Sequence, residues 1–329
     1  SAVSVALASA YEIFGSKIII PRLRVSDIVI FLGLWGLAVI LWWSEPVSPT
    51  HFNPPPMAPN HETYPNSDAL IFDRSAYHLL SGTGFSNQLV RRPLYVGMLA
   101  FFHALGGLDY EGTIFMQILL LAFIPPLTYL LTSKLSNRLA GLMAGGLILL
   151  RERNAIELSD RIMTANAKLM MSDMIAMLGI IAFLYAVTRM LSTKDRSIWS
   201  SMIAGACLGL TALVRAQALI LLPPLLLFIL LEKSPLKIRM KDALLVVLGF
   251  VLVMSPWVWR NWNLTGTFVL DDRGEEKLLA RNYSLDPVAF PPTLPVETEK
   301  EYSARIREPL RGWYRGHEIL SIPPPSSGG

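Results

Sequence analysis

The sequence of 329 residues is poor in charge and almost without cysteine. Charged residues make up 16% of the chain, against about 25% in a typical soluble domain. The one cysteine, Cys207, lies in an apolar block, which excludes a disulfide framework and a cysteine-ligated zinc site. The Walker, GxGxxG, HExxH, CxxC and G-x-S-x-G patterns are absent. The signatures of the common soluble enzyme classes are therefore missing.

The chain is rich in long apolar blocks. Hydrophobic residues make up 52% of it, and the mean hydropathy is +0.44. Several blocks approach the ~20 residues that span a bilayer. This excludes an ordinary soluble enzyme, a disordered protein and a nucleic-acid-binding module. The net charge of +4 and pI near 9.2 then reflect membrane topology, because basic residues set the orientation of multi-pass proteins.

Seven blocks are candidate spanning helices, so we predict an all-α integral membrane protein. They are residues 27–43, 112–132, 139–156, 172–191, 198–214, 217–231 and 242–259.

The charges decide whether an eighth apolar block, 94–106, also spans. Its 13 residues cover only ~20 Å as a helix, short of the ~30 Å core. If it does not span, the inner loops hold 12 Lys and Arg in 37 residues and the outer segments 8 in 94, as the positive-inside rule requires. If it spans, nine of those twelve charges move outside. We therefore predict seven spans, with 94–106 in the outer interface.

This topology divides the chain into three parts. Residues 1–26 form a cytoplasmic segment, 27–259 the transmembrane module with its long outer loop 44–111, and 260–329 an outer tail. The first residue is Ser and the last seven are PPPSSGG, so we interpret the chain as part of a longer one.

The outer loop and the tail contain further predicted helices. In the loop, apolar residues at helical spacing predict an amphipathic helix near 67–80, capped by Asn66 or Ser67 and ended by glycines. With 94–106 it gives two outer helices lying on the membrane. In the tail, a charged stretch near 296–317 favours a helix interrupted by Pro309.

Candidate chemistry lies at the outer membrane edge. Asp68, at the start of the amphipathic helix, is placed to act as a general base, although spacing alone favours a carboxylate that only stabilises the helix dipole. Asp73, one turn on, is expected to pair with Arg74 or Arg92. Arg91 and Arg92 suit a lipid phosphate, because guanidinium donates bidentate bonds to phosphate oxygens; ordinary headgroup binding is the alternative.

The segment 151–173 breaks the positive-inside pattern with four basic residues: Arg151, Arg153, Arg161 and Lys168. An anionic lipid-linked substrate would explain them, and so would pairing with the nearby acids. Asp173 opens a spanning helix, where it could be only a cap. Arg215 and Arg260 are single charges at membrane edges, more typical of anchors than of ligands. His78 and His103 lack a third ligand at useful spacing, so neither supports a metal site.

Several of these segments together resemble a known family. They are SDALIFDRSAYHLLSGTGF, RRPLYVGMLAFFHALGG, MMSDMIAMLG, ALVRAQALILLPPLLLF and SPWVWRNWNLTGTFVL. Over about 27–270 the chain is similar to the polyprenyl-phosphate-sugar-dependent membrane glycosyltransferases of the C-type fold. That group includes protein O-mannosyltransferases and aminoarabinose transferases. The resemblance implies seven spans with two outer juxtamembrane helices, a catalytic acid at Asp68, a lipid-phosphate contact at Arg92 and a functional acid at Asp173.

The resulting hypothesis is a multi-pass glycosyltransferase of a bacterial or archaeal plasma membrane, with its site on the outer face. The donor is a sugar on a polyprenyl phosphate, held by Arg92 with help from Arg91, Arg161, Lys168 or Arg215. The acceptor is a hydroxyl of a protein, lipid or glycan, activated by Asp68 with inversion at the sugar. The other partners are membrane lipids, and neither a cofactor nor nucleic acid is needed. A transporter or lipid flippase, and a structural subunit without an active site, are the alternatives.

Overall fold

The computed structural model describes residues 25–57, 61–85, 89–162, 164–192, 197–266 and 268–270, together with the backbone of 310–314 and 317–321. The chain divides into two units, Ser1–Asp272 and Arg273–Gly329. The described part of the first unit is all-helical. Its elements are α2 (Val25–Ser44), α3 (Asp68–Leu80), α4 (Pro93–Gly106), α5 (Tyr110–Leu121), α6 (Ile124–Leu135), α7 (Arg138–Glu157), α8 (Ser172–Ser192), α9 (Ile198–Val214), the 3₁₀ helix η1 (Ala216–Leu221), α10 (Leu222–Leu231) and α11 (Leu236–Thr265).

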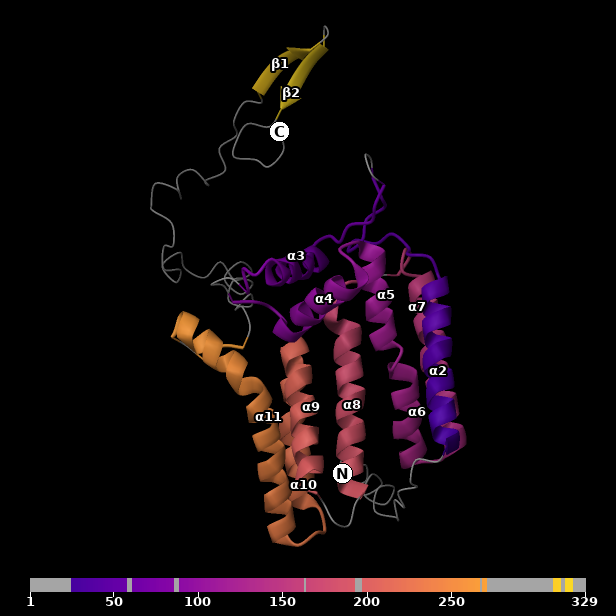
Figure 1. The fold of residues 1–329 in the computed structure, drawn as a ribbon, viewed down its shortest axis with the longest axis vertical. Helices are drawn as coiled ribbons and strands as arrows, with labels where there is room; N and C mark the ends of the chain where they lie inside the picture. Colours follow the sequence, from indigo (N-terminus) through magenta and orange to yellow (C-terminus); the bar gives the residue numbers. More distant parts are fainter. Residues whose placement is uncertain are drawn as a thin grey trace, which may run out of the picture. The chain divides into compact units, whose positions relative to one another are not determined.

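The helices form an upright bundle with two oblique helices across one end (Figure 1). By length and apolar composition, four stretches of the described residues are long enough to cross a membrane: 25–44, 110–135, 172–192 and 236–265. Shorter apolar helices cover 93–106, 198–214 and 216–231. Large apolar side chains such as Val29, Leu147 and Leu244 are exposed on the sides of the bundle. A soluble protein would bury such side chains, so these faces are suited to lipid.

Prolines interrupt two of the predicted spans. The block 112–132 forms α5 and α6 with a break at Ala122 and Phe123, and Pro125 and Pro126 occupy the first turn of α6. Block 217–231 likewise forms η1 followed by α10, with a proline pair in the first turn of α10. Proline is tolerated in a first turn because its missing N–H would lack a helical partner there.

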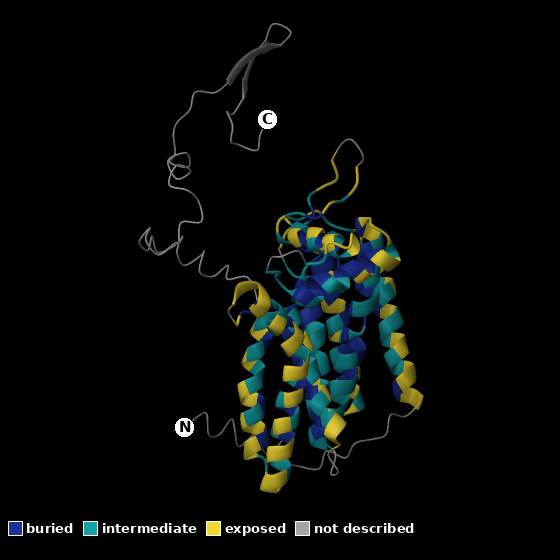
Figure 2. Cartoon of the chain, turned by 60° about the vertical axis from the view of Figure 1, so that its left-hand side comes forward, coloured by how far each residue is buried: buried dark blue, intermediate teal, exposed yellow. Residues whose placement is uncertain are grey.

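The core lies where the oblique helices meet the bundle, as the buried residues of Figure 2 show. Trp42, Tyr95, Leu99, Ile118 and Met170 are among its fully buried side chains. A second, smaller core joins α8, α9, α10 and α11. The amphipathic helix predicted at 67–80 is confirmed as α3. Ser67 occupies its N-cap position, but without a side-chain capping bond.

The second unit contains a two-stranded antiparallel hairpin. β1 (Leu310–Tyr314) pairs with β2 (His317–Ser321) in a register that sets Leu310 opposite Ser321. The helix predicted near 296–317 is therefore wrong over 310–314, while 296–309 lie outside the described residues. A charged composition alone does not separate a helix from a strand in so short a segment.

Close packing of α9 against α11 depends on glycine. A Cβ at Gly205 would fall on the carbonyl of Val246, and one at Gly249 on the carbonyl of Met202. Gly205 and Gly209 are four residues apart on α9, the spacing that lets membrane helices approach closely.

We predict that Gly205→Ala lowers the stability of the protein by about 1–3 kcal/mol, because the added methyl forces the two backbones apart. Thermal unfolding in detergent measures this. The matched control is Gly146→Ala in α7, where a Cβ meets nothing within 4 Å and alanine favours the helix. Equal behaviour of the two variants would contradict the close packing.

Candidate functional site

The candidate base lies at the start of α3. The chain enters the helix through Ser67, whose φ of 56° is left-handed, and Asp68 is the first helical residue. Asn66 fixes the approach, since its backbone N–H donates to Phe52 and its side-chain amide to His51. Asp68 is half-buried, and no residue in the described part of the chain hydrogen-bonds or pairs with its carboxylate. The N–H groups of the first turn favour a negative charge there.

Arg92 lies close to the same face of α3. It is the N-cap of α4, with a left-handed φ of 55°, just before Pro93. Its Cζ is 4.8 Å from the centroid of the Phe72 ring, so the planar guanidinium packs on the aromatic ring. Phe72 is four residues after Asp68, on the same helix face. The ring on which Arg92 packs therefore belongs to the residue one helical turn along α3 from Asp68.

Asp173 and Arg215 form an ion pair beside Arg92. Asp173 is in the first turn of α8, and Arg215 follows α9 in extended conformation before η1. Arg215 Nη1 donates to Asp173 Oδ1, and both side chains are about one-third exposed. Burial and, second, the positive charge of Arg92 lower the pKa of Arg215. Since α4 packs against α9, the two guanidinium groups are near neighbours.

The structure thus brings together three of the predicted site residues: Arg92, Asp173 and Arg215. We call this set the arginine cluster. It carries two positive charges and one negative charge, and it is only partly exposed. A partly buried group with excess positive charge suits an anion, and guanidinium matches phosphate oxygens geometrically.

Three other predicted site residues lie outside the arginine cluster: Arg91, Arg161 and Lys168. Arg91 lines a recess of about 560 Å³ beside α3, together with Arg74 and His78. Arg161 is exposed in the turn after α7. Lys168 is buried, and its ammonium donates to the carbonyls of Trp43 and Glu45 at the end of α2.

Two of the basic residues of the segment 151–173 are paired with acids, one inside the segment and one outside it. Arg151 Nη1 is 2.7 Å from Glu152 Oε2, and Arg153 Nε is 2.6 Å from Glu45 Oε1. The buried Glu152 also accepts from the backbone N–H of Ala167 at 2.5 Å. The pair of Arg151 with Glu152 fits the alternative in which the basic residues pair with the nearby acids, whereas Arg153 pairs with Glu45 of the first loop.

Asp73 has a different partner from the one expected. It was predicted to pair with Arg74 or Arg92, but its Oδ1 lies 2.8 Å from His103 Nε2. His103 Nδ1 is in turn 2.8 Å from the Thr113 hydroxyl. The prediction is wrong because Asp73 points to the buried face of α3, toward α4, whereas Arg74 is exposed.

Arg260 contacts two aromatic rings, whereas its sequence context indicated only an anchor at the membrane edge. Its guanidinium lies over the rings of Trp257, at 4.7 Å, and Phe85, at 5.4 Å. Phe85 follows α3 and lines the recess that contains Arg91. In the sequence, the only signal for this contact is the set of tryptophans around Arg260 in the SPWVWRNWN motif. Across the described residues, no group of three or more His, Cys, Asp or Glu side chains could hold a metal ion.

We predict that Lys168→Met lowers stability by about 1–3 kcal/mol, because two carbonyls lose their charged donor. Binding of a polyprenyl-phosphate sugar, the donor that the sequence resemblance implies, should be unchanged. Thermal unfolding and a lipid-binding measurement on the same preparation check this. Lost binding with unchanged stability would instead assign Lys168 to the substrate.

One known protein family matches much of the chain. The dolichyl-phosphate-mannose-protein mannosyltransferase family matches residues 91–259, just over half of the chain. The match begins at Arg91 and includes the arginine cluster, while Asp68 lies before it. No curated protein and no solved structure matches the chain. The chain belongs to the dolichyl-phosphate-mannose-protein mannosyltransferase family and is an integral membrane glycosyltransferase, as its sequence resemblance predicted.

Proposed function

We propose that the protein transfers a sugar from a polyprenyl-phosphate donor to an acceptor hydroxyl, at the end of the bundle crossed by α3 and α4. The observation that carries this proposal is the arginine cluster, at the end of the bundle where α3 begins with Asp68. Arg92 packs on the ring of Phe72, which is one helical turn after Asp68, and Arg215 is a near neighbour of Arg92. An anionic leaving group and a general base need such an arrangement.

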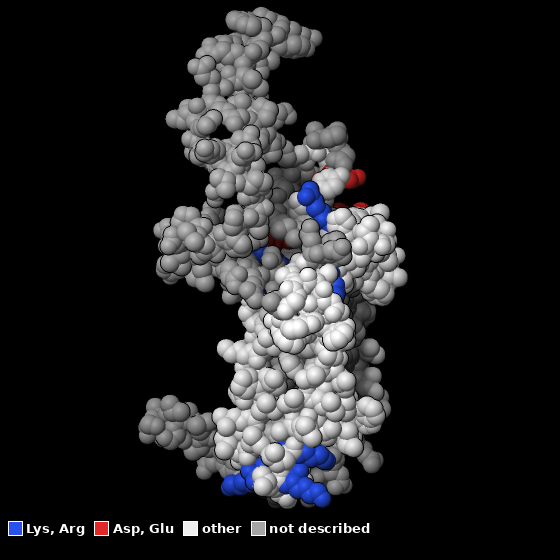
Figure 3. Space-filling model, turned by 90° about the vertical axis from the view of Figure 1, so that its left-hand side faces the viewer, with Lys and Arg blue, Asp and Glu red and all other residues white. Residues whose placement is uncertain are grey.

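The proposed topology has seven spans: α2, α5 with α6, α7, α8, α9, η1 with α10, and α11. In this reading α3 and α4 are the two outer juxtamembrane helices. Figure 3 supports it, because Lys and Arg gather at the end of the bundle opposite these helices. That end includes Lys233, Lys237, Arg239 and Lys241. By the positive-inside rule it faces the cytoplasm, so the site faces outward. We place the protein in a bacterial or archaeal plasma membrane.

In the proposed reaction the arginine cluster holds the donor phosphate. The acceptor oxygen attacks the anomeric carbon from the opposite side and gives its proton to Asp68. The bond from the anomeric carbon to the phosphate oxygen breaks, and polyprenyl phosphate leaves as an anion. Arg92 and Arg215 stabilise the negative charge that develops on the phosphate. A single displacement inverts the configuration at the sugar.

The acceptor is a hydroxyl of a protein, a lipid or a glycan. Either the recess that Arg91, Arg74 and His78 line or the surface around Asp68 would receive it. A base at the start of an outer helix suits enzymes that modify proteins and enzymes that modify lipids.

We predict that Asp68→Asn lowers turnover about 100- to 10,000-fold, because the proton acceptor is lost. Glycosyl transfer in proteoliposomes, with a mixed pool of polyprenyl-phosphate sugars, measures it. Donor binding should persist, since the arginine cluster is intact. Asp160→Asn, an exposed acid in the turn after α7, is the matched control and should stay active.

Each outcome has a distinct meaning. Equal donor consumption by both variants would retain a transferase but remove Asp68 as its base. No binding or consumption of any donor by the unaltered protein would contradict the transferase, and lipid movement would be tested next as the transporter alternative.

We also predict that Arg92→Met and Arg215→Met each weaken donor binding about 10- to 100-fold, the loss expected for a charged hydrogen bond of about 1.5–3 kcal/mol. Lys237→Met, exposed at the opposite end of the bundle, is the control. Binding is measured with a fluorescent polyprenyl-phosphate sugar. If all three variants bind equally, the arginine cluster does not hold the phosphate.

A further inference from the structure

The recess beside α3 combines positive charge with hydrocarbon. Its volume is about 560 Å³, and α3 and the segment between α3 and α4 line it. The lining contains Arg74, His78 and Arg91 and, among the described residues, neither Asp nor Glu. Half of the lining is apolar: Ile71, Phe72, Phe85, Leu89 and Val90. Such a recess suits an anionic group that is joined to apolar surface.

Two further guanidinium groups reach the aromatic rings of this recess. Arg92, of the arginine cluster, packs on Phe72 with its Cζ 4.8 Å from the ring centroid. The Cζ of Arg260 is 5.4 Å from the centroid of Phe85, and its Nη2 donates to the Phe85 carbonyl at 3.5 Å. Since both rings line the recess, it adjoins the arginine cluster, and the added positive charge attracts anions to it.

The recess also shares a face of α3 with the candidate base. Asp68, Ile71, Ser75 and His78 follow one another at intervals of three and four residues, the spacing of one helix face. Arg74 and His78 lie six and ten residues after Asp68, which is about 9–15 Å along the helix axis. An extended peptide advances ~3.3 Å per residue, so this distance corresponds to about three to five residues of peptide.

We infer that the recess binds an acidic side chain of a peptide acceptor, about three to five residues from the hydroxyl that receives the sugar. The inference rests on the proposed function and names its acceptor. A carboxylate fits the cations, and the apolar lining fits the peptide's hydrocarbon side chains. A glycan fits less well, because the Ser75 hydroxyl already donates to the Ile71 carbonyl at 2.7 Å. The many hydroxyls of a glycan would therefore meet mostly hydrocarbon.

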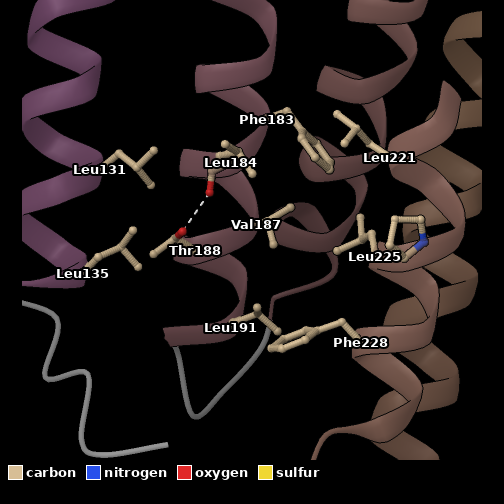
Figure 4. Close-up of a pocket in the computed structure, with 11 residues that line it drawn as sticks. Leu131, Leu135, Phe183, Leu184, Val187, Thr188, Leu191, Leu221, Leu225 and Phe228 are labelled. Atoms are coloured by element: carbon tan, nitrogen blue, oxygen red, sulfur yellow. Dashed lines mark hydrogen bonds between the residues drawn. The ribbon is translucent and has the colours of Figure 1, made fainter. Parts of the chain in front are cut away.

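The apolar pocket between α6, α8 and the η1–α10 segment does not offer these contacts. Figure 4 shows leucine, valine and phenylalanine side chains facing it from the three elements. Its lining has no charged residue, and the Thr188 hydroxyl donates to the Leu184 carbonyl at 2.8 Å. Of these two hollows in the described part of the chain, only the recess beside α3 is suited to an anion.

The test measures glycosyl transfer to peptides by the full chain, in nanodiscs of neutral phospholipid with polyprenyl-phosphate sugars. Each acceptor peptide has a single threonine. One carries Asp at the third and fourth positions on both sides of it, and its twin carries Asn there. We expect the KM for the Asp peptide to be about three- to fivefold lower, the size typical of a partly exposed ion pair, with kcat little changed.

A charge reversal locates this preference. Arg74→Glu should remove the preference for the Asp peptide and favour a third peptide with Lys at the same positions, which also shows that the variant folds. Arg161→Glu, the same change at an exposed arginine outside the recess, is the matched control and should keep the preference for Asp.

The contrary outcomes are distinct. Equal KM values for the three peptides with the unaltered protein would overturn the inference, as would a preference that Arg74→Glu leaves unchanged. If short-chain phosphatidylglycerol, at the concentration of the peptide and below its micelle concentration, abolishes the preference, the recess holds lipid headgroups and the inference fails. Transfer to glycan or lipid hydroxyls but to no peptide would overturn the inference and leave the proposed function intact. Absence of donor binding and donor consumption would overturn both.

Discussion

A chain of buried hydrogen bonds holds the oblique helices α3 and α4 on the bundle, and the geometry of the candidate site depends on it. Asp73 of α3, His103 of α4 and Thr113 of α5 are linked by two contacts of 2.8 Å. His103 contacts the Asp73 carboxylate through Nε2 and the Thr113 hydroxyl through Nδ1. All three side chains are buried, so breaking one link leaves a polar group unpaired at a high cost. α3 and α4 are therefore held together, and with them Asp68 and Arg92.

Buried hydrogen bonds also fix the start of α8. Gln117 of α5 donates to the carbonyls of Ala167 and Leu169, both at 2.8 Å, and its amide oxygen accepts from Tyr95 of α4. Irregular backbone beside a membrane must find its hydrogen bonds inside the protein. Gln117 meets this need for the segment just before α8, which places Asp173 relative to α4.

The sequence predicts the helices, but it does not predict which side chains contact one another. The start of α3 follows from a local period of apolar residues, and the helices near 27–43 and 172–191 from composition alone. The partner of Asp73 depends on which face of α3 meets α4, and no pattern within either segment contains that. Lys168 shows the same limit: as a basic residue it fits a phosphate, yet the fold places it against the carbonyls of Trp43, in α2, and Glu45, just after α2.

The pairing of Arg215 with Asp173 is compatible with phosphate binding and favours it. A guanidinium has five N–H donors, and one carboxylate uses at most two of them. Asp173 can therefore hold the side chain in one orientation while the remaining donors face a ligand, and less conformational entropy is lost on binding. Arg92 is held in a different way, by the face of Phe72. This contact keeps its positive charge beside α3, the helix that begins with Asp68.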